Sequence, residues 1–301
     1  MTQPAHFIHR EIPHTLDWPG RFRLMIGVAV AFTLFHFAAR LAGIPPVPGQ
    51  AGSLLAQPSA AMAMLVTAGA MVVSCLLCKY IVGDLLLGPQ MAGETGAAHV
   101  VQFEGGLVAA LVGAFSLVYR IGPISYALFY AADSRVFVLL AAELMLLFGV
   151  VGFCWLGLQW TAPATLAQSH EPLVRKLSAT GIHAAVMLAC MIFLAQTETV
   201  TQTLAAVGIS AMLASMAAHV AFPVRSTVWY WAGALLVGLI GYAMAYMNPT
   251  GMAIGFPDGP LGALARATPL AYATAGPAGA IFGYWVAASW QHGEAGEKVR
   301  G

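Results

Sequence analysis

The sequence predicts an all-α fold, a polytopic bundle of about eight transmembrane helices. The chain is 59% hydrophobic and only 8% charged, whereas an ordinary soluble domain carries roughly a quarter charged residues. Its 13 Lys and Arg and 12 Asp and Glu are too few to form the charged shell of a soluble protein of 301 residues. Apolar stretches of about 20 residues recur along the chain, and each is long enough to cross roughly 30 Å of hydrocarbon. We therefore expect a lipid bilayer in place of water around most of the protein.

One integral membrane domain is expected over residues 1–301. A polar N-terminal cytoplasmic segment (1–21) precedes the bundle (22–290), and a polar tail (291–301) follows it. The first stretch is rich in His and Pro and does not have the pattern of a cleavable signal peptide, so we expect the first span to be retained. The predicted spans are 22–43, 59–87, 102–121, 136–158, 177–196, 201–222, 228–247 and 269–290, with the short turn at 197–200 as their weakest separator.

The distribution of Lys and Arg favours cytoplasmic positions for both termini, because cytoplasmic loops carry an excess of these residues. With the N-terminus inside, eight basic residues lie on the inner side: Arg10, Arg21, Arg23, Arg175, Lys176, Arg225, Lys298 and Arg300. Four lie on the outer side: Arg40, Arg120, Arg135 and Arg266. Insertion without a cleaved signal, together with this bias, places the protein in a bacterial inner membrane.

Two predicted outer loops, 43–59 and 248–269, are dense in Gly and Pro and cannot be regular helices throughout. Each is either an ordered connector or a re-entrant segment that lines a cavity. Between the third and fourth spans, residues 124–132 follow Pro123 and predict a short interfacial helix.

Small residues on the last span predict close helix packing. Gly276, Gly279 and Gly283 share one helical face, and the last two form a small-xxx-small pair. The seven Trp residues stand near predicted borders, where they are expected to anchor the helices at the headgroup level. The four Cys residues all fall in apolar runs and are expected to pack as small hydrophobic groups.

An ionisable side chain inside a span needs a partner, a cavity or a function. The inner set contains His99 and Glu104 at the start of the third span, His183 in the fifth and His219 in the sixth. His183 and His219 are expected at similar depth because the two spans are antiparallel. Since imidazoles can ligate transition metals and haem iron, His183, His219 and His99 are candidate ligands, and haem is a candidate cofactor. The alternative is that these histidines are hydrogen-bonded between helices.

The outer set contains His36 and Arg40, one turn apart on the first span, and Glu143 in the fourth. A carboxylate in lipid is either protonated or paired, and Arg40 or Arg120 is the expected partner of Glu143. The pair is either an interhelical packing contact or a proton or cation site used in transport.

Three functions are consistent with this sequence. The first is a small transporter, a permease-like protein or a subunit of a membrane complex, with His36, Arg40, Glu143 and Arg120 as candidate residues. The second is a membrane redox subunit that binds haem or quinone through His183 and His219. The third is a structural or assembly subunit without a site of its own. The absence of known catalytic motifs argues against an enzyme, and the lack of clustered Lys and Arg argues against a nucleic-acid partner, whereas other membrane subunits or a second copy of the chain are expected partners.

Overall fold

The computed structural model describes residues 18–44, 52–57, 59–84, 96–129, 131, 134–160, 171–247 and 260–298. Over these residues the chain is helical, without strands. In order, the elements are α1 Trp18–Leu41, α2 Ala60–Lys79, the π-helix η1 Tyr80–Asp84, α3 Gly96–Gly113, α4 Phe115–Ile121, α5 Ser125–Phe129, α6 Val136–Trp160, α7 Leu173–Leu194, α8 Val200–Ala221, α9 Val228–Met247, the 3-10 helix η3 Pro260–Arg266 and α10 Pro269–Lys298. The predicted all-α bundle is confirmed.

Seven helical segments in this described part are long and apolar enough to cross a membrane. They are Gly20–Leu41, Ala60–Val82, Glu104–Phe129, Val136–Trp160, Leu173–Leu194, Val200–Ala221 and Val228–Met247. Their outward faces carry large apolar side chains such as Leu65 and Phe193, which water would solvate poorly and acyl chains solvate well. The protein is therefore a multi-pass membrane protein.

The eighth predicted span, 269–290, is formed as α10 but is not one of these seven apolar helices. The first half of α10 is rich in Ala and Gly, and nearly every residue from Pro269 to Ile281 is buried. A helix enclosed by protein does not need the apolar surface that lipid demands of an outer helix. Beyond Trp290, in the predicted polar tail, α10 continues as a helix to Lys298.

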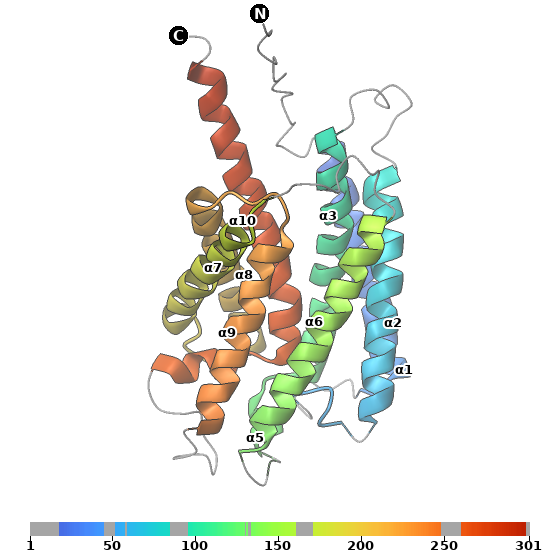
Figure 1. The fold of residues 1–301 in the computed structure, drawn as a ribbon. Helices are drawn as coiled ribbons and strands as arrows, with labels where there is room; N and C mark the ends of the chain where they lie inside the picture. The colour runs from blue at the N-terminus through green and yellow to red at the C-terminus, as the bar shows by residue number, and fades with distance from the viewer. Residues whose placement is uncertain are drawn as a thin grey trace, which may run out of the picture.

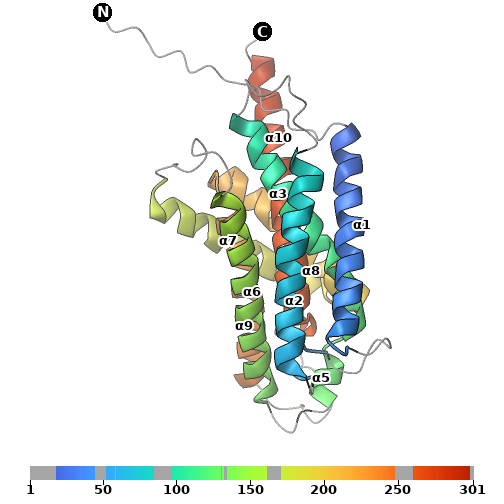
Figure 2. The same ribbon diagram turned by 90° about the vertical axis from the view of Figure 1, so that its right-hand side faces the viewer.

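Figure 1 shows α1, α2 and α3 on one side of the bundle and α7, α8 and α9 on the other. We call α1 to α6 the N-terminal half and α7 to α10 the C-terminal half. The halves meet where α6 packs on α9 and α10, and where α3 packs on α10. Figures 1 and 2 show that α1 begins and α10 ends at the same end of the bundle. We call it the terminal end, and the opposite end the distal end.

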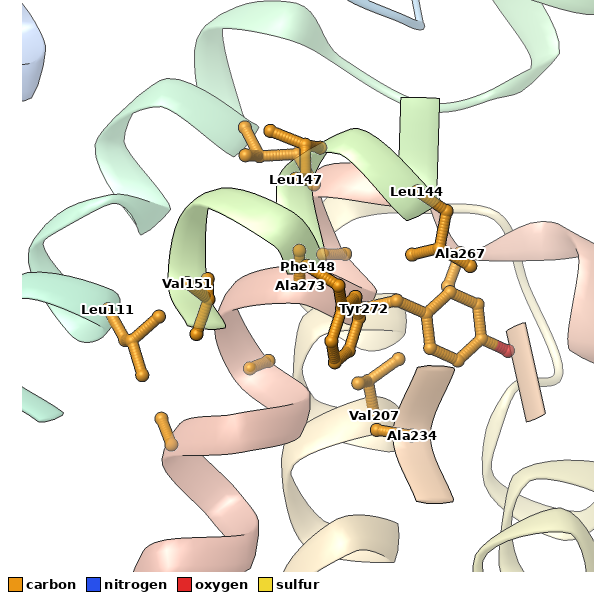
Figure 3. Close-up of a cluster of buried hydrophobic side chains, with 14 of the residues drawn as sticks. Leu111, Leu144, Leu147, Phe148, Val151, Val207, Ala234, Ala267, Tyr272 and Ala273 are labelled. Carbon is orange, nitrogen blue, oxygen red and sulfur yellow. The ribbon is translucent and has the colours of Figure 1, made fainter. Parts of the chain in front are cut away.

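The core joins both halves. Figure 3 shows side chains of α3 (Leu111), α6 (Phe148), α8 (Val207) and α9 (Ala234) gathered around Tyr272 of α10. All five are buried. The hydroxyl of Tyr272 donates a hydrogen bond to the carbonyl of Leu264 at 2.7 Å. The hydroxyl of Tyr242 donates to Ala267 at 2.7 Å, so two tyrosines fasten the chain that leads into α10.

Two predicted local features are confirmed. The break between α7 and α8 spans residues 195–199, where the weak separator was expected. The short helix predicted over residues 124–132 is present as α5, with exposed Tyr126 and Phe129 on its surface.

Candidate functional site

Glu143 lies inside the bundle, on the buried face of α6. Its side chain is 0% exposed. The neighbouring buried positions Leu140, Leu144 and Leu147 follow the three- and four-residue spacing of one helical face. The helical period therefore places a carboxylate on a helix face whose other buried residues are all apolar.

Three donors from one short segment, 52–57, hold this carboxylate. The backbone N–H of Leu54 donates to Oε1 at 3.1 Å, and that of Leu55 donates to Oε2 at 3.1 Å. The hydroxyl of Ser53 also donates to Oε2. Both carboxylate oxygens are thus hydrogen-bonded, which buried polar groups require. All three donors are electrically neutral, so their dipoles are the compensation that the carboxylate receives from the described residues.

The segment enters the bundle at Gly52, whose φ of +62° would be strained in most other residues. The N–H of Gly52 donates to the carbonyl of Ile121 at 3.1 Å. A Cβ on Gly52 would lie 2.7 Å from the carbonyl oxygen of Pro123, so glycine also permits the close approach. Ser53 and Leu54 are buried. The described part of loop 43–59 is ordered, as a connector would be, and is packed into the protein, as a re-entrant segment would be.

In the described part of loop 43–59, two glycines lie in the left-handed region of backbone space. Gly43, with the φ of +69°, follows the end of α1, and Gly52, with the φ of +62°, begins the segment that reaches Glu143. L side chains rarely adopt such values, so glycine at both positions allows the chain to turn back toward the bundle.

The ion pair expected between Glu143 and Arg40 or Arg120 is not formed. Arg120 instead donates from Nη2 to the carbonyl of Ile44 at 3.0 Å, just beyond the end of α1. Arg40 is exposed on α1, and His36 is half-buried with its ring edge against Phe37. The physical reason is that segment 52–57 already satisfies both carboxylate oxygens, and an arginine near a helix end is well used on the free carbonyls there.

The structure does not bring the predicted histidine ligands together. Nε2 of His183 donates to the carbonyl of Ala211 at 3.2 Å, which places His183 level with Ala211 on α8. His219 lies eight residues further along α8, about 12 Å away at 1.5 Å per residue. The two helices are antiparallel, but the rings lie at different depths. His183 lies well inside α7, which begins at Leu173, whereas His219 lies close to the end of α8 at Ala221.

Each of these histidines has a local partner. Nδ1 of His219 lies 2.9 Å from the hydroxyl of Tyr230, and its ring edge meets Tyr284 at 5.0 Å between centroids. His183 is fully buried, and its Nδ1 has no hydrogen-bond partner in the described part of the chain. His99 belongs to α3, but its side chain lies outside the described residues. No group of three or more His, Cys, Asp or Glu among the residues described is arranged to hold a metal ion.

The cysteines behave as packing residues on different faces of α2. The thiol of Cys78 donates to the carbonyl of Gly27 on α1 at 3.3 Å, whereas Cys75 lies against Cys154 of α6. Cys75 and Cys78, which are three residues apart in the sequence, are both buried. They contact different helices, so the pair does not act as a joint ligand set.

A second buried carboxylate, Glu104, lies at the terminal end. It is 3% exposed. The hydroxyl of Thr227 donates to Oε1 at 2.7 Å, and Nε1 of Trp285 donates to Oε2 at 2.9 Å. Again both oxygens are satisfied, and again both donors are neutral.

Sequence reasoning named Glu143 and Glu104 but missed the side chains that hold them. Ser53 stands in a Gly- and Pro-rich loop where nothing distinguishes it from other serines. Trp285 was expected to be an interfacial anchor, and its ring instead serves Glu104. Trp231 is also inside the protein, against Phe148 with ring centroids 6.0 Å apart. The available signal was the rule that a buried carboxylate needs donors, which predicts partners without identifying them.

No protein-family model, curated protein or solved structure matches this chain. The functional argument therefore depends on the geometry of the two carboxylates.

Proposed function

We propose that the protein is a small proton-driven transporter in which Glu143 takes up and releases the proton. The observation that carries the proposal is a fully buried carboxylate held by three neutral donors from an inserted segment. A structural ion pair would place a cation beside the carboxylate. Here a proton is the simplest group that neutralises the charge, since an isolated buried charge is strongly unfavourable.

Protonation of Glu143 changes the strength of the hydrogen bonds that attach segment 52–57 to α6. The ionised carboxylate accepts bonds from the N–H groups of Leu54 and Leu55 and from Ser53. The protonated acid has an O–H group of its own on one oxygen, and that oxygen becomes a poorer acceptor. Hydrogen bonds to charged groups contribute about 1.5–3 kcal/mol each, so uptake of a proton weakens the attachment of the segment. Proton binding is thereby coupled to movement of a loop at the distal end.

The same proposal places the protein in the inner membrane of a bacterium, with its termini in the cytoplasm. Segment 52–57 then faces the outer side, where it can admit a proton to Glu143. Arg120 has a supporting role, because it fastens the chain that follows α1 and leads into this segment. A partner subunit or a second copy of the chain would pack on the lipid-facing helices.

Glu143→Gln is expected to lower proton flux at least tenfold. The experiment uses proteoliposomes that contain a pH-sensitive dye, with a potassium diffusion potential as the driving force. Gln has nearly the same size as Glu and cannot carry a proton across. Glu198→Gln, in the turn between α7 and α8 at the same end, is the matched control and should conduct as the wild type does. Equal flux in wild-type and protein-free vesicles, or undiminished flux in Glu143→Gln, would overturn the proposal.

A further inference from the structure

Glu104 connects the two halves of the bundle at the terminal end. The residue belongs to α3 in the N-terminal half, and both of its donors belong to the C-terminal half. Thr227 immediately precedes α9, and its carbonyl accepts the N–H of Tyr230 at 2.9 Å and of Trp231 at 3.2 Å. Trp285 lies on α10. One carboxylate thus holds the beginning of α9 and the later part of α10 against α3.

This contact differs from a second polar contact that joins the halves in the described part of the chain. At the distal end the hydroxyl of Tyr119 on α4 donates to that of Thr201 on α8 at 3.2 Å, between exposed side chains. An exposed hydroxyl pair exchanges easily with water and contributes little. The Glu104 contact is buried and involves an ionisable group, so its strength depends on the protonation state of that group.

We propose that Glu104 is a second proton-binding site, which locks the two halves together at the terminal end while it is ionised and releases them when it takes up a proton. This inference rests on the proposed function, in which a proton drives the transport cycle. Glu143 controls an inserted segment at the distal end, and Glu104 controls the contact between the halves at the terminal end. The two carboxylates would therefore gate opposite ends of one bundle.

The elements at the terminal end carry several other ionisable groups. They are Arg21 and Arg23 on α1, Lys79 on α2, Glu171 before α7, His219 on α8, Arg225 before α9 and Tyr284 on α10. Tyr284 lies close enough to interact electrostatically with Glu104, Glu171 and Arg225. Glu171 accepts the backbone N–H of Arg225 at 3.1 Å, and His219 faces Tyr230 and Tyr284. The two hydrogen bonds that Glu104 itself accepts both come from neutral groups, Thr227 and Trp285.

The lock follows from hydrogen-bond chemistry. An ionised Glu104 accepts from the O–H of Thr227 on one oxygen and from the N–H of Trp285 on the other. A protonated Glu104 places its hydrogen on the oxygen that faces Thr227, because the Thr227 hydroxyl can turn and accept it, whereas the N–H of Trp285 has no lone pair to offer. Both contacts then become hydrogen bonds between neutral groups, each weaker than a hydrogen bond to a charged carboxylate, while the apolar packing between the halves remains.

The test measures the separation of the halves with spin labels. Cysteines replace the exposed residues Tyr80, at the start of η1, and Val174, on α7, in a background without the four native cysteines. Distances are recorded by pulsed electron resonance in lipid nanodiscs between pH 8 and pH 5. The wild-type site is expected to show one distance at high pH and a shift to longer distance at low pH. Glu104→Gln should show the longer distance at both pH values, because its amide group mimics the protonated acid.

Two further variants separate the lock from a folding defect. Trp285→Phe and Thr227→Val each remove one donor and keep the carboxylate, so each is expected to show the longer distance at a pH where the wild type is still closed. Glu143→Gln is the matched control and should retain the wild-type pH response at this end. A distance that does not change with pH in the wild type, or an unshifted distance in Glu104→Gln, overturns the inference. Proton flux is measured separately. If Glu143→Gln did not lower the flux but the distance between the labels still increased at low pH, the transport proposal would be rejected and the proposal for Glu104 would be retained.

Discussion

A carboxylate surrounded by helices can be stabilised by a cation or by neutral hydrogen-bond donors, and Glu143 and Glu104 both have neutral donors. Neither accepts a hydrogen bond from an Arg or Lys in the described part of the chain. Each receives neutral N–H and O–H donors on both oxygens. Neutral donors stabilise the anion less than a cation does and leave the proton equilibrium of the group adjustable. A permanent ion pair would instead hold the carboxylate in one state.

Ser53→Ala tests the attachment of the inserted segment. The substitution removes the hydroxyl that donates to Glu143 and accepts the N–H of Ala56 at 3.2 Å. We expect a loss of about 1–3 kcal/mol in stability, since a buried polar group loses a partner. The measurement is unfolding of the purified protein in mixed micelles. Ser59→Ala, whose hydroxyl donates to Ala42 at 3.2 Å at the edge of the same loop, is the control and should lose less. Equal losses in the two variants would contradict the central role of Ser53.

The helices of the C-terminal half owe their close packing to glycines. A Cβ on Gly279 of α10 would lie 2.2 Å from the carbonyl oxygen of Gly208 on α8, and one on Gly283 would lie 2.2 Å from that of Met212. The predicted small-xxx-small face is therefore confirmed, and its partner is a helix of the same chain. Gly276 on this face approaches Ala234 of α9. Small residues allow α10 to run through the middle of the bundle.

Gly279→Ala is expected to destabilise the protein by about 1–3 kcal/mol or more, because the new methyl group meets backbone and can be accommodated only if α8 and α10 separate. Gly149→Ala on α6 is the matched control, since nothing lies within 4 Å of the position a Cβ would take there. Alanine favours helix over glycine by about 1 kcal/mol, so this control should be neutral or stabilising. Thermal unfolding followed by circular dichroism distinguishes the two. A loss of similar size at both positions would show that packing against α8 is not the cause.

Basic residues lie at both ends of the bundle, but their surroundings differ between the two ends. At the terminal end lie Lys79, Lys176 and Arg225, and at the distal end Arg120 and Arg266 bind carbonyl groups that follow helix ends. Nη1 of Arg266 donates to Ala195 at 2.7 Å and to Gln196 at 2.6 Å, just beyond α7. Both distal arginines bind backbone carbonyls, whereas Lys79 and Lys176 at the terminal end lie over the rings of Tyr80 and Trp229.

Cysteine labelling tests the orientation of the bundle. Thr197→Cys lies in the exposed turn between α7 and α8 at the distal end, and Pro223→Cys lies in the exposed turn between α8 and α9 at the terminal end. In intact bacterial cells an impermeant maleimide should label the first and leave the second unmodified until the membrane is opened. The reverse pattern would place the termini outside, and labelling of both in intact cells would contradict a crossing by α8.

The amino-acid sequence was sufficient to establish the membrane class, seven of the spans and the close packing of the last helix. These features depend on local composition and helical period, which can be counted along the chain. The same reasoning found both carboxylates, because ionisable residues are conspicuous in apolar runs. It did not recognise that α10 is enclosed by protein, although the Ala- and Gly-rich composition of this helix is less apolar than that of the other spans.

The partners of those carboxylates were decided by contacts between distant parts of the chain. Ser53 reaches Glu143 across 90 residues, and Trp285 reaches Glu104 across 181. His183 and His219 failed to meet for the same reason, because their depths depend on where each helix begins and how it packs. Hydrogen-bond donors act over about 3 Å, whereas sequence patterns report only which face of an element a residue occupies. The composition of the sequence therefore determines that lipid surrounds the protein, whereas tertiary packing determines which groups bind the two buried carboxylates.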